Sequence, residues 1–150
     1  MFLFSARTTP LEASQPLNPL ALALASDASF LARGFAGNIE HLSGLLKAGM
    51  ERKVFSLIDI LQPCVSFNHK NTYQWYRERV YKLEDERYNP VDKLVAFAKV
   101  QEWGERIPIG VIYRKERLVY EEQIPALKEA PLVKQRIDPL QFEELLNEFA

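Results

Sequence analysis

The sequence is poor in the residues that most metal and cofactor motifs require. Its 150 residues include one cysteine, two histidines and six glycines. One cysteine cannot close an intrachain disulfide or ligate an iron–sulfur cluster, and no recognised zinc spacing is present. The glycines form no dinucleotide-binding, phosphate-loop or nucleophile-elbow motif. We therefore expect no disulfide, no protein-only metal site and no iron–sulfur cluster in this chain.

An excess of charge of one sign is also lacking. The 19 basic and 20 acidic residues are spread along the chain, and the net charge is −1. No basic stripe is interleaved with aromatic residues, which argues against nucleic acid and anionic membranes as partners. The longest apolar run, at 19–25, is too short to span a bilayer, and the first residues do not resemble a signal peptide. We expect a cytoplasmic protein.

What is present is enough apolar surface for a core, arranged as an α/β pattern. Apolar residues make up 47% of the chain. A strand is expected at 28–35, a helix from residue 39 with Asn38 as its cap, and a strand at 53–61. The second strand is apolar at almost every position, which is typical of a strand buried on both faces of a parallel sheet. Together these segments predict a βαβ unit.

Other patterns predict further helices and one more strand. In the helix that Asn71 opens, Tyr73, Tyr76, Val80 and Leu83 form one stripe, and Glu78 pairs with Lys82. Three strands are fewer than a doubly wound sheet needs, so 17–150 is expected to be part of an α/β domain and 1–16 an irregular leader. Three further helices are expected: 19–26, with Asn18 as its cap and Pro19 in its first turn; 89–104, opened by Asn89 and Pro90; and 138–149, with Asp138 as its cap. A strand is expected at 106–114, where Pro108 indicates either an edge strand of the sheet or the start of a strand.

Four side chains are candidates for the rim of a pocket. Arg33 and the group Cys64, Asn68 and His69 follow the two predicted parallel strands, and ligands collect where parallel strands end. Arg33 could hold a carboxylate or phosphate, and Asn68 offers both a donor and an acceptor. In the structural alternative, Arg33 pairs with a neighbouring acid and Asn68 closes a turn.

Cys64 also has two interpretations. A working thiol needs a lowered pKa, which a cation or a helix N-terminus supplies, and His41 or His69 would complete a nucleophile triad. A free cysteine is also among the most frequently buried residues, and Cys64 would then be a small packed side chain.

Four segments carry a resemblance to a known family. The segments "NPLALALASDASFLARGFAGNIEHLSGLLKAG", "FSLIDILQPCVSFN", "NTYQWYRERVYKLE" and "QEWGERIPIGVIYR" resemble, in order, the C-terminal half of the β subunit of 2-oxoacid:ferredoxin oxidoreductases. That subunit binds thiamine diphosphate (thiamine pyrophosphate), and the resemblance covers roughly residues 5 to 133. It implies a partial thiamine-diphosphate-binding, Rossmann-like parallel sheet flanked by helices.

The resemblance also implies an activity, cofactors and partners. Relatives decarboxylate a 2-oxoacid such as pyruvate or 2-oxoglutarate, pass the acyl group to coenzyme A and send electrons to ferredoxin. Their diphosphate is anchored through magnesium by a GDGD-type motif and a later Asn, which this sequence lacks. Thr8 and Thr9 match the end of the family's "SPTTP" segment and are the only cofactor-binding candidates. The implied partners are an α-type subunit and a separate N-terminal half, with ferredoxin as an indirect partner.

Three hypotheses follow from these observations. The first is a truncated β subunit, inactive without the cofactor-binding half and the partner subunits, whether by gene splitting, frameshift or fragmentation. The second is a non-catalytic subunit-interaction module derived from the same family. The third is an independent thiol enzyme that uses Cys64.

Overall fold

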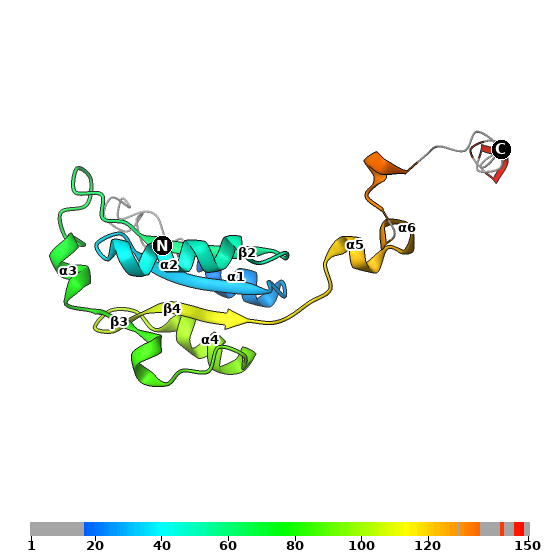
Figure 1. The fold of residues 1–150 in the computed structure, drawn as a ribbon. Helices are drawn as coiled ribbons and strands as arrows, with labels where there is room; N and C mark the ends of the chain where they lie inside the picture. Colours follow the sequence, from blue (N-terminus) through cyan, green and yellow to red (C-terminus); the bar gives the residue numbers. More distant parts are fainter. Residues whose placement is uncertain (1–16, 129, 136–141, 143–145, 149–150) are drawn as a thin grey trace, which may run out of the picture. The chain divides into compact units, whose positions relative to one another are not determined.

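The computed structural model describes residues 17–128, 130–135, 142 and 146–148 (Figure 1). The chain divides into two compact units, residues 1–117 and 118–150. Thr8 and Thr9 lie outside the described residues. Within the described part, no helix is long and apolar enough to cross a membrane.

The first unit is built on a mixed four-stranded sheet in the order β2-β1-β4-β3. β1 and β2 are parallel, as are β3 and β4, whereas β1 and β4 are antiparallel. The predicted α/β class is confirmed, with one antiparallel pair in the sheet that we expected to be parallel. The strands are β1 (Phe30–Phe35), β2 (Ser56–Leu61), β3 (Val80–Lys82) and β4 (Ile107–Arg114).

The predicted βαβ unit is confirmed as β1, α2 (Ile39–Met50) and β2. The Asn38 side chain accepts a hydrogen bond from the His41 backbone N–H at 3.3 Å, which caps α2 as expected. Gly49 lies where α2 packs against β2. A Cβ atom at Gly49 would lie 2.9 Å from Ile58 Cδ1.

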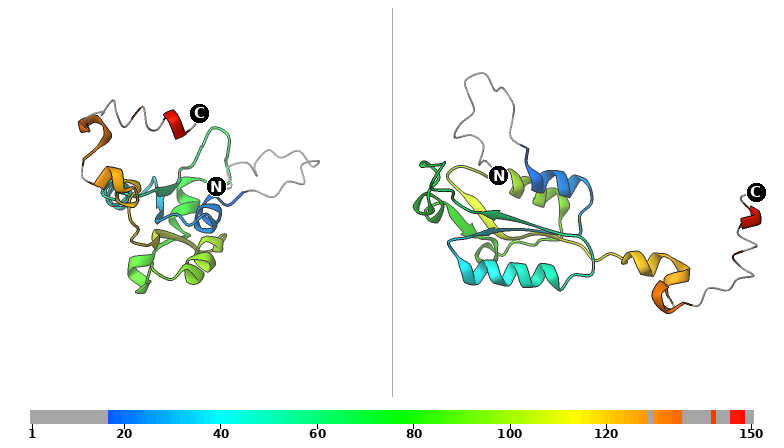
Figure 2. Two further views of the ribbon diagram at one scale, coloured as in Figure 1. Left: turned by 90° about the vertical axis from the view of Figure 1, so that its right-hand side faces the viewer. Right: turned by 90° about the horizontal axis from the view of Figure 1, so that it is seen from above.

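Helices cover both faces of the sheet. Figure 2 shows α2 on one face and α1 (Pro19–Ala25) with α4 (Lys93–Gln101) on the other. Asn18 caps α1, as predicted, and its Nδ2 atom donates to the Val100 carbonyl at 2.9 Å, so this residue also ties α1 to α4. The core beneath the two helices contains Leu20, Leu24, Leu31, Ala96, Val100 and Ile112.

The helix predicted from Asn71 to Leu83 is mostly wrong. The structure has a five-residue helix, α3 (Tyr73–Arg77), then β3, then the 3₁₀ turn η1 (Leu83–Glu86). Thr72, not Asn71, caps α3, and Glu78 forms an ion pair with Arg79 instead of the predicted pair with Lys82. Residues 80–82 pair in parallel with β4, so long-range strand pairing outweighs the helical spacing of the apolar residues.

Two other predicted boundaries are also corrected. The helix expected to open at Asn89 and Pro90 begins at Lys93, where the Asp92 carboxylate accepts from the Leu94 and Val95 backbone N–H groups at 2.9 and 3.1 Å. It ends at Gln101, not at Trp103. Pro108 lies at the start of β4, which confirms one of the two positions predicted for it. The other predicted position, on an edge strand, is wrong, because β4 is an interior strand of the sheet.

The prediction that residues 53–61 are buried on both faces is wrong for this chain. β2 is one of the two outer strands of the sheet, most of its residues are half-buried, and Ile60 is 39% exposed. The interior strand β1, by contrast, is buried along its whole length. From its apolar composition, β2 is expected to be more buried than it is among the described residues.

The second unit contains short helical segments. These are α5 (Tyr120–Gln123), α6 (Pro125–Lys128) and the 3₁₀ turn η2 (Leu132–Lys134). The helix predicted at 138–149, with its Asp138 cap, lies largely outside the described residues, although 146–148 are helical.

Candidate functional site

The carboxyl ends of β1 and β2 lie at one edge of the sheet, as the parallel pairing predicts. The backbone N–H of Ala36 donates to the Leu61 carbonyl at 3.0 Å and joins the two strand ends. The loop 62–72 follows β2 and carries three of the four candidate residues. This edge is where a pocket was expected.

Arg33 forms a buried ion pair with an acid on the neighbouring strand. Its Nε atom donates to Asp59 Oδ2 at 3.0 Å, and the two residues are register partners in the β1–β2 pair. The guanidinium also lies 5.8 Å from the ring centroid of Trp103. Arg33 is only 2% exposed. This is the contact that the structural alternative for Arg33 predicts.

Aromatic residues pack against one another near the ion pair. Tyr76 lies 5.7 Å from Phe35 and 6.4 Å from Trp103 between ring centroids. Burial raises the pKa of the Tyr76 hydroxyl, the Asp59 charge raises it further, and the Arg33 charge opposes both. The pair therefore lies in a largely apolar environment, where each charge depends on the other.

Cys64 and Asn68 belong to one turn in the loop. The Cys64 carbonyl accepts from the Phe67 and Asn68 N–H groups at 3.2 and 2.8 Å. The buried Asn68 side chain accepts from the Lys70 and Asn71 N–H groups, both at 3.0 Å. Asn68 thus closes a turn, as its structural alternative predicts.

The four candidate residues do not form one cluster of side chains. Cys64 is half-buried, His69 is exposed, and the Arg33 side chain forms an ion pair with Asp59. A role for these four residues at a pocket rim stays a prediction.

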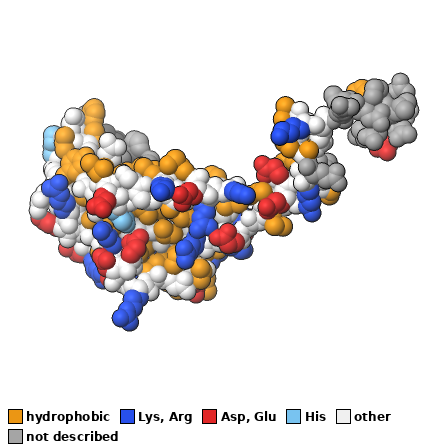
Figure 3. Space-filling view, in the orientation of Figure 1, with side chains coloured by type: hydrophobic (Ala, Val, Ile, Leu, Met, Phe, Trp, Pro, Cys, Tyr) orange, Lys and Arg blue, Asp and Glu red, His pale blue; other side chains and the backbone are white. Residues whose placement is uncertain are grey.

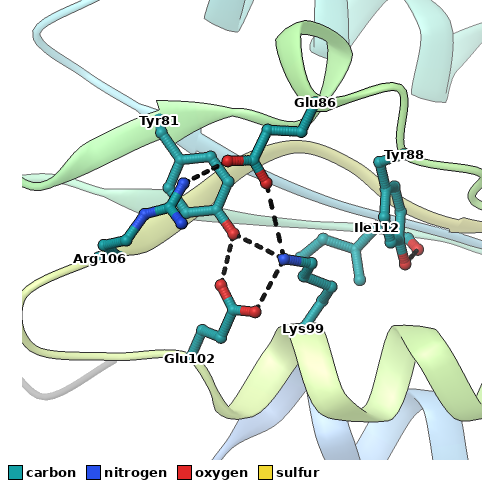
Figure 4. Close-up of polar contacts among 7 residues, drawn as sticks. All are labelled: Tyr81, Glu86, Tyr88, Lys99, Glu102, Arg106 and Ile112. Carbon is teal, nitrogen blue, oxygen red and sulfur yellow. Dashed lines mark hydrogen bonds and ion pairs between the residues drawn. The ribbon is translucent and has the colours of Figure 1, made fainter.

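A polar cluster that the sequence did not reveal ties β3 and η1 to α4 (Figure 4). Lys99 Nζ contacts Glu102 Oε1 at 2.8 Å, the Tyr81 hydroxyl at 2.9 Å and Glu86 Oε2 at 3.8 Å. The Tyr81 hydroxyl donates to Glu102, and Arg106 pairs with Glu86 while its guanidinium lies 4.2 Å from the Tyr81 ring centroid. The only local signal was the i, i+3 spacing of Lys99 and Glu102.

The electrostatics of this cluster favour a structural role. Burial lowers the pKa of Lys99, but its hydrogen bonds to Glu102 and Tyr81 outweigh burial and raise it. Burial raises the pKa of Glu102, and the bonds from Lys99 and Tyr81 lower it by more. Burial and the Glu102 hydrogen bond raise the pKa of Tyr81. All three groups are therefore held in their neutral-pH protonation states, which does not suit an acid–base catalyst.

The described residues do not fit a magnesium–diphosphate anchor. Among them, no three His, Cys, Asp or Glu side chains gather in a way that could hold a metal ion. The full sequence contains no GDGD motif.

Comparisons with known proteins point to one enzyme family. The family model for the C-terminal region of the pyruvate ferredoxin oxidoreductase beta subunit matches residues 64–129. The chain is 43% identical over 121 residues to a 2-oxoacid:ferredoxin oxidoreductase subunit beta of Sulfolobus sp, covering 73% of this chain and 40% of that one. The corresponding subunit of Saccharolobus solfataricus is 40% identical over 119 residues, covering 72% of this chain and 39% of that one.

A solved structure shares the fold. It is the 2-oxoglutarate:ferredoxin oxidoreductase from Magnetococcus marinus with 2-oxoglutarate, coenzyme A and succinyl-CoA bound. The match has a TM-score of 0.77 and 25% identity, and it covers 93% of this chain and 48% of that chain. The chain thus spans about 40% of the length of the curated relatives it matches.

Proposed function

We propose that this chain, a homologue of 2-oxoacid:ferredoxin oxidoreductase β subunits over about 40% of their length, works as the corresponding portion of such an enzyme. The observation that supports this most strongly is the 43% identity over 121 residues. The match to the Magnetococcus marinus fold over 93% of this chain supports it independently.

The proposed reaction is the oxidative decarboxylation of a 2-oxoacid. The bond between C1 and C2 of the acid breaks and CO₂ leaves, while a thioester forms between C2 and the sulfur of coenzyme A. The thiol proton is released, and the electron pair is passed to ferredoxin. Thiamine diphosphate, when bound in the assembled enzyme, supplies the electron sink for the decarboxylation.

This chain contributes structure to that enzyme and requires partners for activity. The described residues form a sheet, its helices and the loop 62–72, and no three of their His, Cys, Asp or Glu side chains gather where they could hold a metal ion. The partners are the remainder of a β subunit, which supplies the cofactor site, and an α-type subunit. Ferredoxin is the indirect partner, and a cytoplasmic location stays a prediction.

Reconstitution tests this function. The chain is co-expressed with the portion of the Saccharolobus solfataricus β subunit that it does not match and with that enzyme's α subunit. We expect ferredoxin reduction that depends on a 2-oxoacid, on coenzyme A and on this chain. Omitting this chain is the control. We also expect calorimetry of the chain alone with magnesium and thiamine diphosphate to show no binding, and tight stoichiometric binding would contradict the proposal.

A non-catalytic interaction module is the second candidate. It is favoured by the intact hydrophobic core of the first unit in a sequence that lacks a GDGD motif. A complex that forms and copurifies but reduces no ferredoxin would support this candidate and reject the first.

A further inference from the structure

The outer edge of β2 carries backbone groups that pair with no other strand of the described residues. Leu61 directs its carbonyl toward β1, where it accepts from Ala36. Alternate residues of a strand direct their N–H and C=O groups to the same side, so Leu57 and Asp59 also face β1. The N–H and C=O groups of Ser56, Ile58 and Ile60 therefore face outward. Among the described strands, only β1 pairs with β2.

The composition of β2 does not suit an edge exposed to water. Natural edge strands carry lysine, proline, a bulge or an inward-pointing charge that prevents further pairing. The six residues "SLIDIL" contain no lysine and no proline, and the β1–β2 register runs without a shift. The one charged residue of β2, Asp59, forms an ion pair with Arg33 of β1. Nothing in β2 thus blocks the addition of another strand.

Exposed apolar side chains flank the free edge. Phe55 precedes β2 and is 63% exposed, and Phe67 in the loop after it is 68% exposed. Ile60 within the strand and Val65 in the loop are also exposed. Figure 3 shows hydrophobic side chains gathered along the upper side of this unit. An added strand and the layer that follows it would cover such side chains.

We infer that the outer edge of β2 is an interface that pairs in parallel with a β-strand from the portion of the β subunit that this chain does not match. The inference rests on the proposed function. More than half of the Sulfolobus subunit has no counterpart in this chain, since the chain covers 40% of it. Four of the six residues of β2 are leucine or isoleucine. Such a largely apolar strand is typical of the interior of a parallel sheet, where it has a neighbour on each side.

A second copy of this chain fits the edge less well. Two copies related by a two-fold axis would pair their β2 strands antiparallel, because a two-fold axis reverses the strand direction. The parallel addition instead needs a different segment of chain, reached through a crossover connection. Self-association through β2 is therefore an outcome that the test must separate from the proposed one.

Residue-resolved amide exchange tests the interface. The full chain is measured alone and in complex with the co-expressed, unmatched portion of the Saccharolobus solfataricus β subunit. We expect the amides of Ser56, Ile58 and Ile60 to exchange at least about 100-fold more slowly in the complex. The amides of Leu57, Asp59 and Leu61 should be protected in both samples. Unchanged exchange at the three outward amides in a formed complex would overturn the inference, as would their protection in a dimer of the chain alone.

A proline substitution tests the same edge by affinity. Ile60→Pro removes an outward N–H and should weaken the complex at least about tenfold, because proline is tolerated only where the N–H faces away from the sheet. Ile60→Thr keeps the N–H and the β-branched shape, and it should bind within about twofold of the unmodified chain. Equal binding of the two variants would contradict the inference.

A second variant covers the case in which Ile60→Pro does not fold. Phe67→Ser alters an exposed loop side chain and should also weaken the complex, whereas Val91→Ser, at an exposed residue just before α4, should not. Failure of the interface and failure of the function are distinguishable. Ferredoxin reduction without β2 protection would reject only the interface, and β2 protection without ferredoxin reduction would reject only the catalytic function.

Discussion

Asp59 on β2 lies directly opposite Arg33 on β1, and its Oδ2 atom accepts a hydrogen bond from Arg33 Nε at 3.0 Å. Among the described residues, no hydrogen-bond partner contacts the buried Arg33 Nη1 atom. Asp59 is therefore the anion on which the buried guanidinium depends, and the pair joins the two parallel strands at the edge where ligands were expected. Its energetic role can be measured directly.

The first prediction concerns this pair. Asp59→Ala leaves the Arg33 charge buried without a partner, so the free energy of unfolding should fall by about 3–5 kcal/mol. Urea denaturation followed by circular dichroism measures the loss. Glu78→Ala, which removes the more exposed ion pair with Arg79, is the matched control and should cost less than about 1 kcal/mol.

The double variant Arg33→Met with Asp59→Leu extends this test. It replaces both charges with apolar side chains and should recover most of the stability lost in Asp59→Ala. A double variant as unstable as the single one would show that packing around the strands, and not the unpaired charge, causes the loss.

The second prediction concerns two glycines, one at which an added methyl group should destabilise the fold and one at which it should not. Gly110 in β4 has a φ of +124°, and a Cβ atom there would lie 2.8 Å from the Glu84 carboxylate oxygens. Gly110→Ala should destabilise the protein by about 1–3 kcal/mol. Gly44→Ala is the control, because its Cβ would meet nothing within 4 Å and α2 should gain up to about 1 kcal/mol. Thermal unfolding of both variants measures these changes. A Gly110→Ala melting temperature equal to or above that of the unmodified chain would contradict the prediction.

The third prediction concerns stability at high pH. Burial raises the pKa of Tyr88 to about 12, and its hydroxyl donates to the Ile112 carbonyl at 2.7 Å. Because the folded-state pKa exceeds the ordinary value of 10, the contribution of Tyr88 is complete below pH 10 and is lost as the pH rises toward 12. Tyr88→Phe should therefore be less stable at pH 8 by about 1 kcal/mol and should lose less stability between pH 10 and pH 12. Urea midpoints at these pH values measure the difference, and parallel curves would contradict it.

The fourth prediction concerns stability at low pH. Hydrogen bonds from Lys99 and Tyr81 hold the pKa of Glu102 below its ordinary value of 4.5, although burial opposes them. A lowered folded-state pKa contributes stability that is present above pH 4.5 and is lost as the pH falls through the folded-state value. Glu102→Gln should therefore lose less stability than the unmodified chain when the pH falls from 7 to 3. The comparison is between urea midpoints at pH 7 and at pH 3, and Glu105→Gln, at an exposed residue nearby, is the control.

Local signals in the sequence predicted much of the first unit. Asn18 and Asn38 were correctly identified as caps because a cap depends only on a side chain and the backbone three residues away. The βαβ unit was predicted correctly because an amphipathic helix between two apolar segments has few alternative folds. The Asn89–Pro90 cap failed because Asp92 provides an equally local and better placed carboxylate.

The candidate site was predicted less well than the fold. Both parallel strand ends meet at one edge as expected, but Asp59 occupies Arg33, and Asn68 is used within its own turn. The cluster around Lys99 joins residues from η1, α4, β3 and the segment before β4, and no local spacing reveals such a combination. Thr8 and Thr9 lie outside the described residues, so their proposed role stays a prediction.

The sequence by itself determined the α/β class, the two capped helices, the parallel β1–β2 unit and the family resemblance, because each depends on residues close together in the chain or on ordered segments. Only the tertiary structure decided that residues 80–82 form a strand, that β4 runs antiparallel to β1 and that Asp59 partners Arg33. It also decided that, among the described strands, β2 has a single neighbour. These features depend on contacts between residues far apart in sequence. Their free energy comes from strand pairing and shared burial, which a local pattern does not contain.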